Sequence, residues 1–262
     1  MTPDEYKFLY ELEERHWWFV GMRRIVAALL DGAVPGRAER ILDAGCGTGL
    51  MLSWLRRYGK ESSVFGLDFS SFAVRYSAQR GERLLVEGSI AAMPFPSECF
   101  DLVTTFDVLD SFPVPGAAAP FGELARVLKP GGVLLVRVPA FQFLYSQHDR
   151  AVCTEHRYTA RELRQRLEEQ GLTIARTTYA ITILFPVALA WRWLTRSRTD
   201  NPQSDVRPLP GPLRWLNPLL AGLLAMEAAW LRWLPWRLPF GLSVMALARK
   251  PTTGADGPGG PE

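Results

Sequence analysis

The segment that most constrains the fold is a glycine-rich turn between two apolar runs. The motif DAGCGTG (43–49) follows the strand-like run ERILDA (39–44) and precedes the helix-like run LMLSWLRRY (50–58). Glycines let the backbone turn sharply and approach a ligand closely, and a helix N-terminus offers free N–H donors. This order predicts a ligand site at the carboxyl end of the first strand.

The spacing of the glycines excludes the usual dinucleotide site. That site needs Gly or Ala at position 50, where this chain has Leu50. Asp43 would also repel a pyrophosphate, whereas it suits a ligand that carries a cationic amino group. Asp68 ends the second expected strand, where an acid can accept hydrogen bonds from two ribose hydroxyls.

Strand-like and helix-like runs alternate along most of the chain, which is typical of a parallel sheet with helices on both faces. The expected strands are residues 39–44, 64–67, 84–86, 100–106, 133–138, 172–179 and 242–248. The expected helices are residues 4–31 as one or two, 50–58, 72–80, 121–128 and 159–170. Lys129-Pro-Gly-Gly132 is expected to stop one of these helices, and Thr159 with Glu162 predicts a capping box that opens another.

Four motifs in this order resemble those of class I S-adenosylmethionine-dependent methyltransferases. They are ILDAGCGTG, GLDFS, AAMPFPSECFDLV and RVLKPGGVLLV, and they cover roughly residues 39–140. The chain is most similar to the type 11-like branch, which includes quinone and lipid methyltransferases. HWWFVGMRR and LPFGLSVMALARK also resemble bacterial methyltransferases of envelope lipid or glycan pathways. The resemblance implies a Rossmann-like, doubly wound, seven-stranded, mostly parallel sheet and S-adenosylmethionine as cofactor.

The resemblance also implies which residues bind the cofactor. Asp43 would line the methionine part, Asp68 would hold the ribose, and Phe69 would lie beside the adenine. The expected set is Asp43, Gly45, Cys46, Gly47, Gly49, Asp68, Phe69, Ser89, Ile90 and Phe106. Ser89-Ile90 departs from the family, which usually has an acid near the adenine amino group.

Asp107, His148 and His156 are the candidate catalytic residues. The resemblance implies that Asp107 faces the sulfonium and the acceptor, although a helix cap is an equally good interpretation. Each histidine follows the fifth strand and can take a proton near neutral pH, with an exposed or structural role as the alternative. Asp110-Ser111 stands where the family often has a histidine, which leaves the base open. The possible metal ligands after the fifth strand match no standard site in their spacing, so no metal is expected. They are His148, Asp149, Cys153, Glu155 and His156.

The chain divides into five predicted parts: an N-terminal helical cap (1–38), the cofactor-binding core (39–179), a helical insertion (180–240), the last core strand (241–250) and a disordered tail (251–262). In the cap, Trp17 and Trp18 either form part of a lid or pack on the core.

The insertion is the basic, tryptophan-rich part of the chain. Residues 176–250 hold 10 Lys and Arg against 3 Asp and Glu, and six of the nine Trp lie between positions 191 and 236. Asn217-Pro218 is expected to start a helix there, with Asn217 as N-cap. The longest run without charge, residues 177–191, is too short to span a bilayer, so no transmembrane segment is expected. Trp and Arg beside apolar surface favour an element that lies on a membrane, and an internal subdomain is the alternative.

These features predict an enzyme that methylates a small hydrophobic or lipid-linked acceptor at the cytoplasmic membrane face. The alternatives are methylation of a soluble metabolite and a non-catalytic cofactor-binding or membrane-docking partner of an envelope enzyme. Three widely spaced cysteines and a charged N-terminus without a signal-peptide pattern favour the cytoplasm. The positive charge is interleaved with apolar runs, which disfavours nucleic acid as a partner. The acceptor atom and the oligomeric state are left open.

Overall fold

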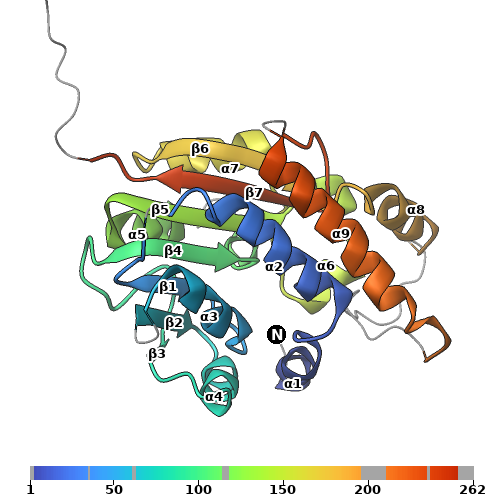
Figure 1. The fold of residues 1–262 in the computed structure, drawn as a ribbon, viewed down its shortest axis with the longest axis horizontal. Coiled ribbons are helices and arrows are strands. Elements are labelled where there is room, and N and C mark those ends of the chain that lie inside the picture. The colour runs from blue at the N-terminus through green and yellow to red at the C-terminus, as the bar shows by residue number, and fades with distance from the viewer. Residues whose placement is uncertain are drawn as a thin grey trace, which may run out of the picture.

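A mostly parallel sheet with helices on both faces forms the centre of the molecule (Figure 1). The structure is a computed structural model that describes residues 3–34, 36–60, 63–113, 118–195, 211–234 and 237–252. The described residues form a seven-stranded sheet of order β3-β2-β1-β4-β5-β7-β6. β7 runs antiparallel to its neighbours β5 and β6, and the other pairs are parallel. The predicted α/β class and sheet are therefore confirmed.

The strands lie close to their predicted positions. They are β1 (Ile41–Ala44), β2 (Val64–Asp68), β3 (Leu85–Glu87), β4 (Phe100–Phe106), β5 (Leu128–Pro139), β6 (Thr173–Ala180) and β7 (Ser243–Arg249). β5 begins five residues earlier than expected, because Leu128 already pairs with Phe100 of β4 and the next residues bond to Lys250 just after β7. Gly131 N–H donates to Lys250 O, and Lys250 N–H donates to Gly132 O.

The helices include those predicted and several short additions. The α-helices are α1 (Pro3–Leu12), α2 (Trp17–Leu30), α3 (Leu50–Leu55), α4 (Ser71–Gln79), α5 (Ala118–Val127), α6 (Gln147–Ala151), α7 (Ala160–Glu168), α8 (Phe185–Thr195) and α9 (Leu216–Trp233). Short 3-10 turns are η1 (Arg56–Tyr58), η3 (Leu109–Ser111), η5 (Gln142–Leu144) and η6 (Gly211–Leu213). The N-terminal helical region and the helical insertion before the last strand are both present, as expected.

The two faces of the sheet carry separate apolar cores because consecutive strand residues point to opposite sides. Val103 belongs to the core under α5 and α7, whereas Leu102 belongs to the core under α2, α3 and α9. α2 and α9 cross closely, since a Cβ on Gly21 would lie 2.3 Å from Leu224 Cδ1. The two helices are far apart in the sequence and lie side by side over the sheet (Figure 1).

At two predicted helix starts the capping contacts differ from those expected. α9 begins at Leu216 with Trp215 in the N-cap position, so Asn217 is not its N-cap. The Asn217 side chain instead accepts a hydrogen bond from Trp17 N–H at the start of α2. At α7, Thr159 accepts from Glu162 N–H as predicted, but the Glu162 carboxylate binds His156 instead of reaching back to the N-cap.

The insertion is anchored by one buried carboxylate. Glu227 of α9 is 2% exposed, and it accepts backbone N–H bonds from Ile181 (2.5 Å), Thr182 (2.8 Å) and Ile183 (3.3 Å) just before α8. Glu227, the charged residue that interrupts the apolar pattern of α9, thus makes a tertiary contact with the segment before α8. None of the helices in the described part of the chain reaches the length and apolarity needed to cross a bilayer. The predicted tail lies mostly outside the described residues, and the predicted domain boundaries stay predictions.

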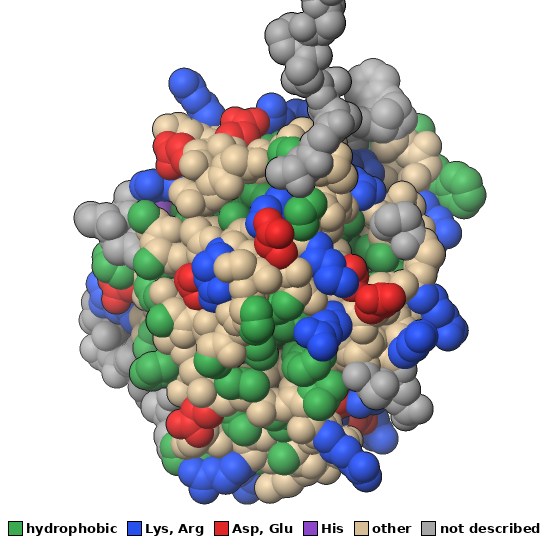
Figure 2. Space-filling model, turned by 90° about the vertical axis from the view of Figure 1, so that its left-hand side faces the viewer, with side chains coloured by type: hydrophobic (Ala, Val, Ile, Leu, Met, Phe, Trp, Pro, Cys, Tyr) green, Lys and Arg blue, Asp and Glu red, His purple; other side chains and the backbone are tan. Residues whose placement is uncertain are grey.

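The end of the molecule where the parallel strands begin has a mixed surface. Figure 2 shows basic and acidic side chains dispersed among apolar ones on this face. Lys129 pairs with Asp101 at 2.7 Å, and Lys250 pairs with Glu98 at 3.1 Å. The functional groups predicted from the sequence lie at the opposite, carboxyl edge of the strands.

Candidate functional site

The glycine turn after β1 has a conformation that only glycine adopts easily. Gly45 has a φ of +88°, and a Cβ there would lie 2.1 Å from Val108 Cγ2. The N–H groups of Gly45 and Cys46 both donate to Leu67 O, at 2.7 and 2.9 Å. These bonds hold the turn against the end of β2.

Asp68 is held in place by two backbone donors. Its Oδ2 accepts from Gly47 N–H and its Oδ1 accepts from Ser70 N–H, each at 2.9 Å. Burial raises the pKa of Asp68, and the two N–H donors oppose that rise. A carboxylate offers about four lone-pair sites, so Asp68 keeps capacity for two further donors. Its free lone pairs suit a ribose diol, and the ribose role of Asp68 stays a prediction.

Asp43 is a buried carboxyl beside the same turn. It is 2% exposed and accepts a hydrogen bond from Thr104 Oγ1 at 2.7 Å. Burial raises its pKa to about 7, partly offset by the Thr104 hydrogen bond and the positive charge of Arg137. A cation brought close would favour the ionised form. The fit to S-adenosylmethionine is good, because that cofactor carries an ammonium, a sulfonium and a ribose.

The other predicted cofactor residues lie around this centre in different environments. Gly49 has a φ of +89° and precedes α3, and Phe69 is 81% exposed. Cys46 and Ile90 are buried in the two apolar cores. Ser89 Oγ accepts a hydrogen bond from Ala91 N–H. The roles of these side chains in binding stay predictions.

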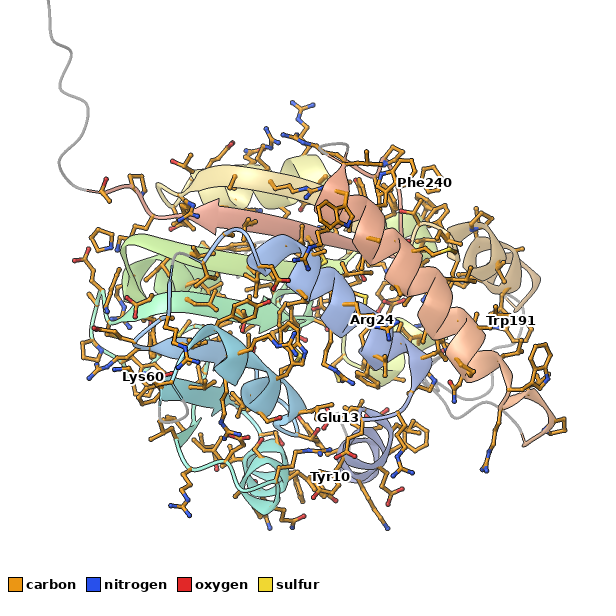
Figure 3. All side chains as sticks on the ribbon, viewed as in Figure 1. Tyr10, Glu13, Arg24, Lys60, Trp191 and Phe240 are labelled. Atoms are coloured by element: carbon orange, nitrogen blue, oxygen red, sulfur yellow. The ribbon has the colours of Figure 1, made fainter. Side chains whose placement is uncertain are left out.

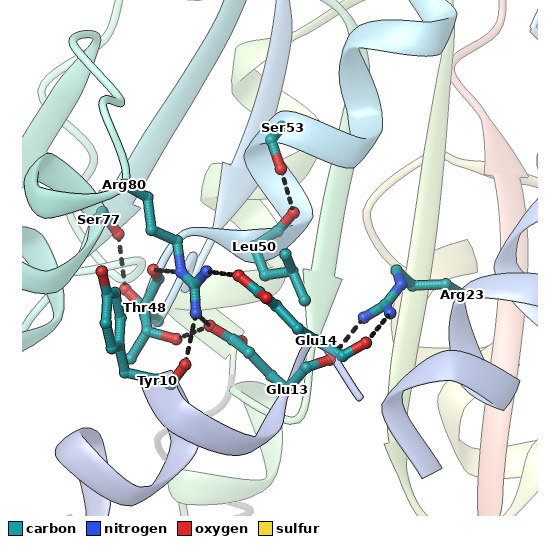
Figure 4. Close-up of polar contacts among 10 residues, drawn as sticks. Tyr10, Glu13, Glu14, Arg23, Thr48, Leu50, Ser53, Ser77 and Arg80 are labelled. Carbon is teal, nitrogen blue, oxygen red and sulfur yellow. Dashed lines mark hydrogen bonds and ion pairs between the residues drawn. The ribbon is translucent and has the colours of Figure 1, made fainter. Parts of the chain in front are cut away.

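The segment after α1 is bound to the glycine turn by charged groups (Figure 4). Arg80 forms ion pairs with Glu13 and Glu14, each at 2.8 Å, and donates to Thr48 O at 3.0 Å. The Thr48 hydroxyl also donates to Glu13. Sequence reasoning missed the Glu13–Arg80 contact, because no local pattern links residues 67 positions apart. The N-terminal segment therefore covers the turn through Glu13.

Asp107 lies at the end of β4 with a φ of +55°. Its carboxylate forms an ion pair with Arg137 of β5 at 2.6 Å. The Arg137 guanidinium lies 4.9 Å from the ring centre of Trp18 and 5.0 Å from that of Phe106. Trp18 thus contacts the guanidinium that pairs with Asp107, and the Asp107 side chain binds Arg137 instead of capping a helix.

The two candidate histidines lie on the segment that follows β5. His156 Nε2 is 2.7 Å from Glu162 Oε1, and its ring lies edge-on to Tyr158. His148 lies in α6 and is partly buried. The structure thus joins His156 to Glu162 of α7 and Asp107 to Arg137 of β5. A catalytic role for any of the three residues stays a prediction.

Asp110 stands where the family often has a histidine, and it is buried at this edge. It is 3% exposed and accepts from Thr154 Oγ1 at 2.8 Å, while its Oδ1 has no hydrogen-bond partner among the described residues. Burial and the neighbouring charge of Asp107 raise its pKa to about 7. The carbonyl of Asp110 accepts from Glu155 and His156 N–H. Sequence reasoning treated this acid only as a departure from the family pattern.

Comparisons with known proteins agree with this geometry. The profile of a family described as "Methyltransferase domain" matches residues 42–136. The chain is 38% identical to a malonyl-[acyl-carrier protein] O-methyltransferase of Herminiimonas arsenicoxydans over 116 residues, which are 44% of this chain and 43% of the relative. It is 37% identical to a ubiquinone/menaquinone biosynthesis C-methyltransferase of Neisseria gonorrhoeae over 109 residues, which are 38% and 42% of the two chains.

Solved structures show the same fold. The chain superposes on geranyl diphosphate C-methyltransferase from Streptomyces coelicolor, determined with S-adenosyl-L-homocysteine, with a TM-score of 0.55 and 17% identity over 86% of this chain and 77% of that one. The chain spans less than half the length of the two curated relatives. The matched residues contain the glycine turn, Asp68 and Asp107. Residues 42–136 of the chain therefore form a methyltransferase domain, and its relatives are S-adenosylmethionine-dependent methyltransferases of class I.

Proposed function

We propose that this protein transfers the methyl group of S-adenosylmethionine to a small hydrophobic or lipid-linked acceptor at the cytoplasmic face of a membrane. The main support for a hydrophobic or lipid-linked acceptor is the exposed aromatic surface of the insertion. Trp191, Trp215, Trp230 and Trp233 are 59%, 65%, 49% and 78% exposed. Trp with an apolar body and a polar N–H prefers the interface of a bilayer.

The place of this surface supports the same proposal. Figure 3 shows Trp191 at the end of the molecule toward which β4 and β5 point, which is also the end that holds Asp107. Arg214 is exposed on the same segment and supplies positive charge, whereas the exposed Arg232 pairs with Asp31 at 2.8 Å. Cationic groups near apolar surface attract anionic lipids. An acceptor that stays in the bilayer would then meet the carboxyl edge of the sheet.

The residues of the site have separate tasks in this proposal. S-adenosylmethionine supplies an electrophilic methyl group when it is bound. Asp68 orients the ribose, and ionised Asp43 holds the cationic end of the cofactor. Glu13, fixed by Arg80 and Thr48, covers the turn and limits the access of water. Transfer to an oriented acceptor needs mainly in-line positioning.

An acceptor hydroxyl would also have to lose a proton. Asp110 lies beside Asp107 and has a pKa of about 7, so its carboxyl can receive a proton near neutral pH. Asp110→Asn tests this role. We expect lower turnover with unchanged affinity for the cofactor, and a loss of the pH dependence of turnover near pH 7. Unchanged turnover would mean that Asp110 is not the base and that Asp107 or a histidine accepts the proton.

The names of two relatives support a lipid-like acceptor. One is named for a substrate on an acyl carrier protein, and the other for quinone biosynthesis. A second candidate acceptor is a soluble metabolite. The packing of α9 favours it, because Leu224, Ala228 and Leu231 are buried in the core with α2, so part of the insertion acts as a scaffold.

The test is transfer of labelled methyl from S-adenosylmethionine into a total cell extract, followed by organic and aqueous partition. Asp68→Ala is the control, in which we expect weakened cofactor binding. We expect label in the organic phase with the wild type and much less with the control. Label confined to the aqueous phase would favour the soluble acceptor. An absence of label in an extract that contains the acceptor would favour a non-catalytic role.

A further inference from the structure

A pocket of about 420 Å³ opens at the outer edge of the sheet, beside the edge strand β6. It lies between the first turn of α7 and the segment that leads from α9 to β7. Its lining residues are Ala160, Arg161, Arg164, Thr177, Thr178, Tyr179, Arg237, Leu238 and Pro239. β6 is separated from β4 by β5 and β7, so the pocket is distinct from the cofactor turn.

Three arginines give the pocket its charge. Arg161 and Arg164 come from α7, and Arg237 comes from the opposite wall. Among the residues that the structure describes, none of the three guanidinium groups has an ion pair or a hydrogen bond. By contrast, Arg166 of the same helix lies 3.9 Å from Glu169. Three uncompensated guanidinium groups around one cavity favour an anionic ligand, because their planar donors match carboxylate and phosphate oxygens.

A buried hydroxyl provides a second, independent indication of a ligand. Thr177 lines the pocket and is 3% exposed, and its Oγ1 has no hydrogen-bond partner among the described residues. The neighbouring polar groups are satisfied, since Thr178 Oγ1 accepts from Leu238 N–H and the Tyr179 hydroxyl accepts from Ala160 N–H. Buried polar groups without partners are rare and costly. A ligand oxygen in the pocket would accept a hydrogen bond from the Thr177 hydroxyl.

The remaining walls are apolar and continue toward exposed aromatic surface. Leu238 and Pro239 form one side of the pocket. The next residue, Phe240, is 40% exposed and lies 5.3 Å from the ring of Phe185 at the start of α8. Figure 3 shows Phe240 on the outside of the molecule near α8. A ligand with both an anionic group and an apolar part would therefore fit best.

We propose that this pocket binds a phosphate-type anionic group through Arg161, Arg164, Arg237 and the Thr177 hydroxyl. The group comes either from the headgroup of a membrane lipid or from a free phosphate compound. Bound lipid headgroups would fix the orientation of the insertion on a membrane. The inference goes beyond methyl transfer and is tested by binding, so it can fail while the methyltransferase activity stands.

The experiment compares the wild type with the double variant Arg161→Ala/Arg164→Ala and with Thr177→Val. Binding of inorganic pyrophosphate is measured by calorimetry. Binding to vesicles of phosphatidylcholine, with and without phosphatidylglycerol, is measured by co-sedimentation at low salt. We expect the double variant to bind pyrophosphate at least about tenfold more weakly, because charge-assisted hydrogen bonds are lost. Thr177→Val should also bind pyrophosphate more weakly. Its free energy of unfolding should not be lower than that of the wild type.

Arg166→Ala is the matched control, because it removes a positive charge from the same helix at a residue paired with Glu169. It should bind like the wild type. If the double variant loses both pyrophosphate and phosphatidylglycerol vesicles, the source is a lipid headgroup. If it loses pyrophosphate and keeps vesicle binding, the pocket takes a free phosphate compound. If the wild type binds no anion, or the double variant binds as the wild type and Arg166→Ala do, the proposal is overturned.

Discussion

The half of the sheet around β1 and β2, to which we assign the cofactor, and the half around β6 and β7, to which we assign the proposed acceptor, position their polar groups by different means. We call them the cofactor half and the acceptor half. Around β1 and β2, Asp68 is held by the N–H groups of Gly47 and Ser70, which belong to the two turns that follow these strands. Around β6 and β7, Glu227 of α9 holds residues 181–183, about 45 positions away in the sequence. The first arrangement follows from short motifs, and the second depends on tertiary packing.

This difference indicates that the two halves determine different properties of the protein. The glycine turn and Asp68 fit one cofactor, whereas the chain is similar to relatives named for different acceptors. The acceptor half contains the insertion, the exposed tryptophans and the arginine-lined pocket. We therefore expect substitutions in the cofactor half to affect cofactor affinity, and those in the acceptor half to affect stability or acceptor choice.

The largest expected effect is on the insertion. Glu227→Ala would leave three backbone N–H groups before α8 without their acceptor, and it should lower the free energy of unfolding by about 3 kcal/mol. Urea denaturation measures this. Met226→Ala, at an exposed neighbour, should change it by less than about 0.5 kcal/mol. Equal stability of the two variants would show that Glu227 does not anchor α8.

The next effect tests the cofactor half. Asp68→Ala removes the carboxylate that we assign to the ribose, and it should weaken S-adenosylhomocysteine binding about 100-fold, since hydrogen bonds to charged groups contribute roughly 1.5–3 kcal/mol each. Calorimetric titration measures this. Glu98→Ala, an acid at the amino edge of the sheet, should bind normally. Unchanged affinity in Asp68→Ala would remove the ribose role.

A smaller effect is expected at the junction of the N-terminal segment and the glycine turn. Arg80→Ala breaks the ion pairs with Glu13 and Glu14, so it should weaken cofactor binding about tenfold and expose α1 to proteolysis. Arg75→Ala on the same helix is the control, because Arg75 contacts only Ser71 and Phe72 in the interactions described. Identical proteolysis of the two variants would argue against a covering role for Glu13.

The smallest effect concerns pH. The pKa of Asp43 is raised to about 7, so lowering the pH from 8 to 6 protonates it and removes its attraction for the cationic cofactor. Affinity for S-adenosylmethionine should fall about fivefold over this range. Asp43→Asn should bind weakly at both pH values. A wild-type affinity independent of pH would place the cofactor ammonium away from Asp43.

The extent to which the sequence predicted the structure follows the same division. The strand pattern, the glycine turn and Asp68 were predictable, because alternating apolar runs and glycines with positive φ act locally. Asn217 lies in the predicted helix but does not cap it, because its amide oxygen accepts from Trp17 N–H at the start of α2. The Glu13–Arg80 contact and the burial of Glu227 and Asp110 depend on contacts between distant segments, which no local pattern specifies.

The most direct test of the central claim is calorimetric titration of the wild-type protein at pH 8 with S-adenosylhomocysteine and, separately, with NAD. Both ligands contain an adenosine, but only the first lacks a pyrophosphate and carries an ammonium for Asp43. We predict one saturable site for S-adenosylhomocysteine and no measurable binding of NAD. Binding of NAD at the same site with equal or higher affinity, or no binding of S-adenosylhomocysteine, would contradict the assignment of the glycine turn.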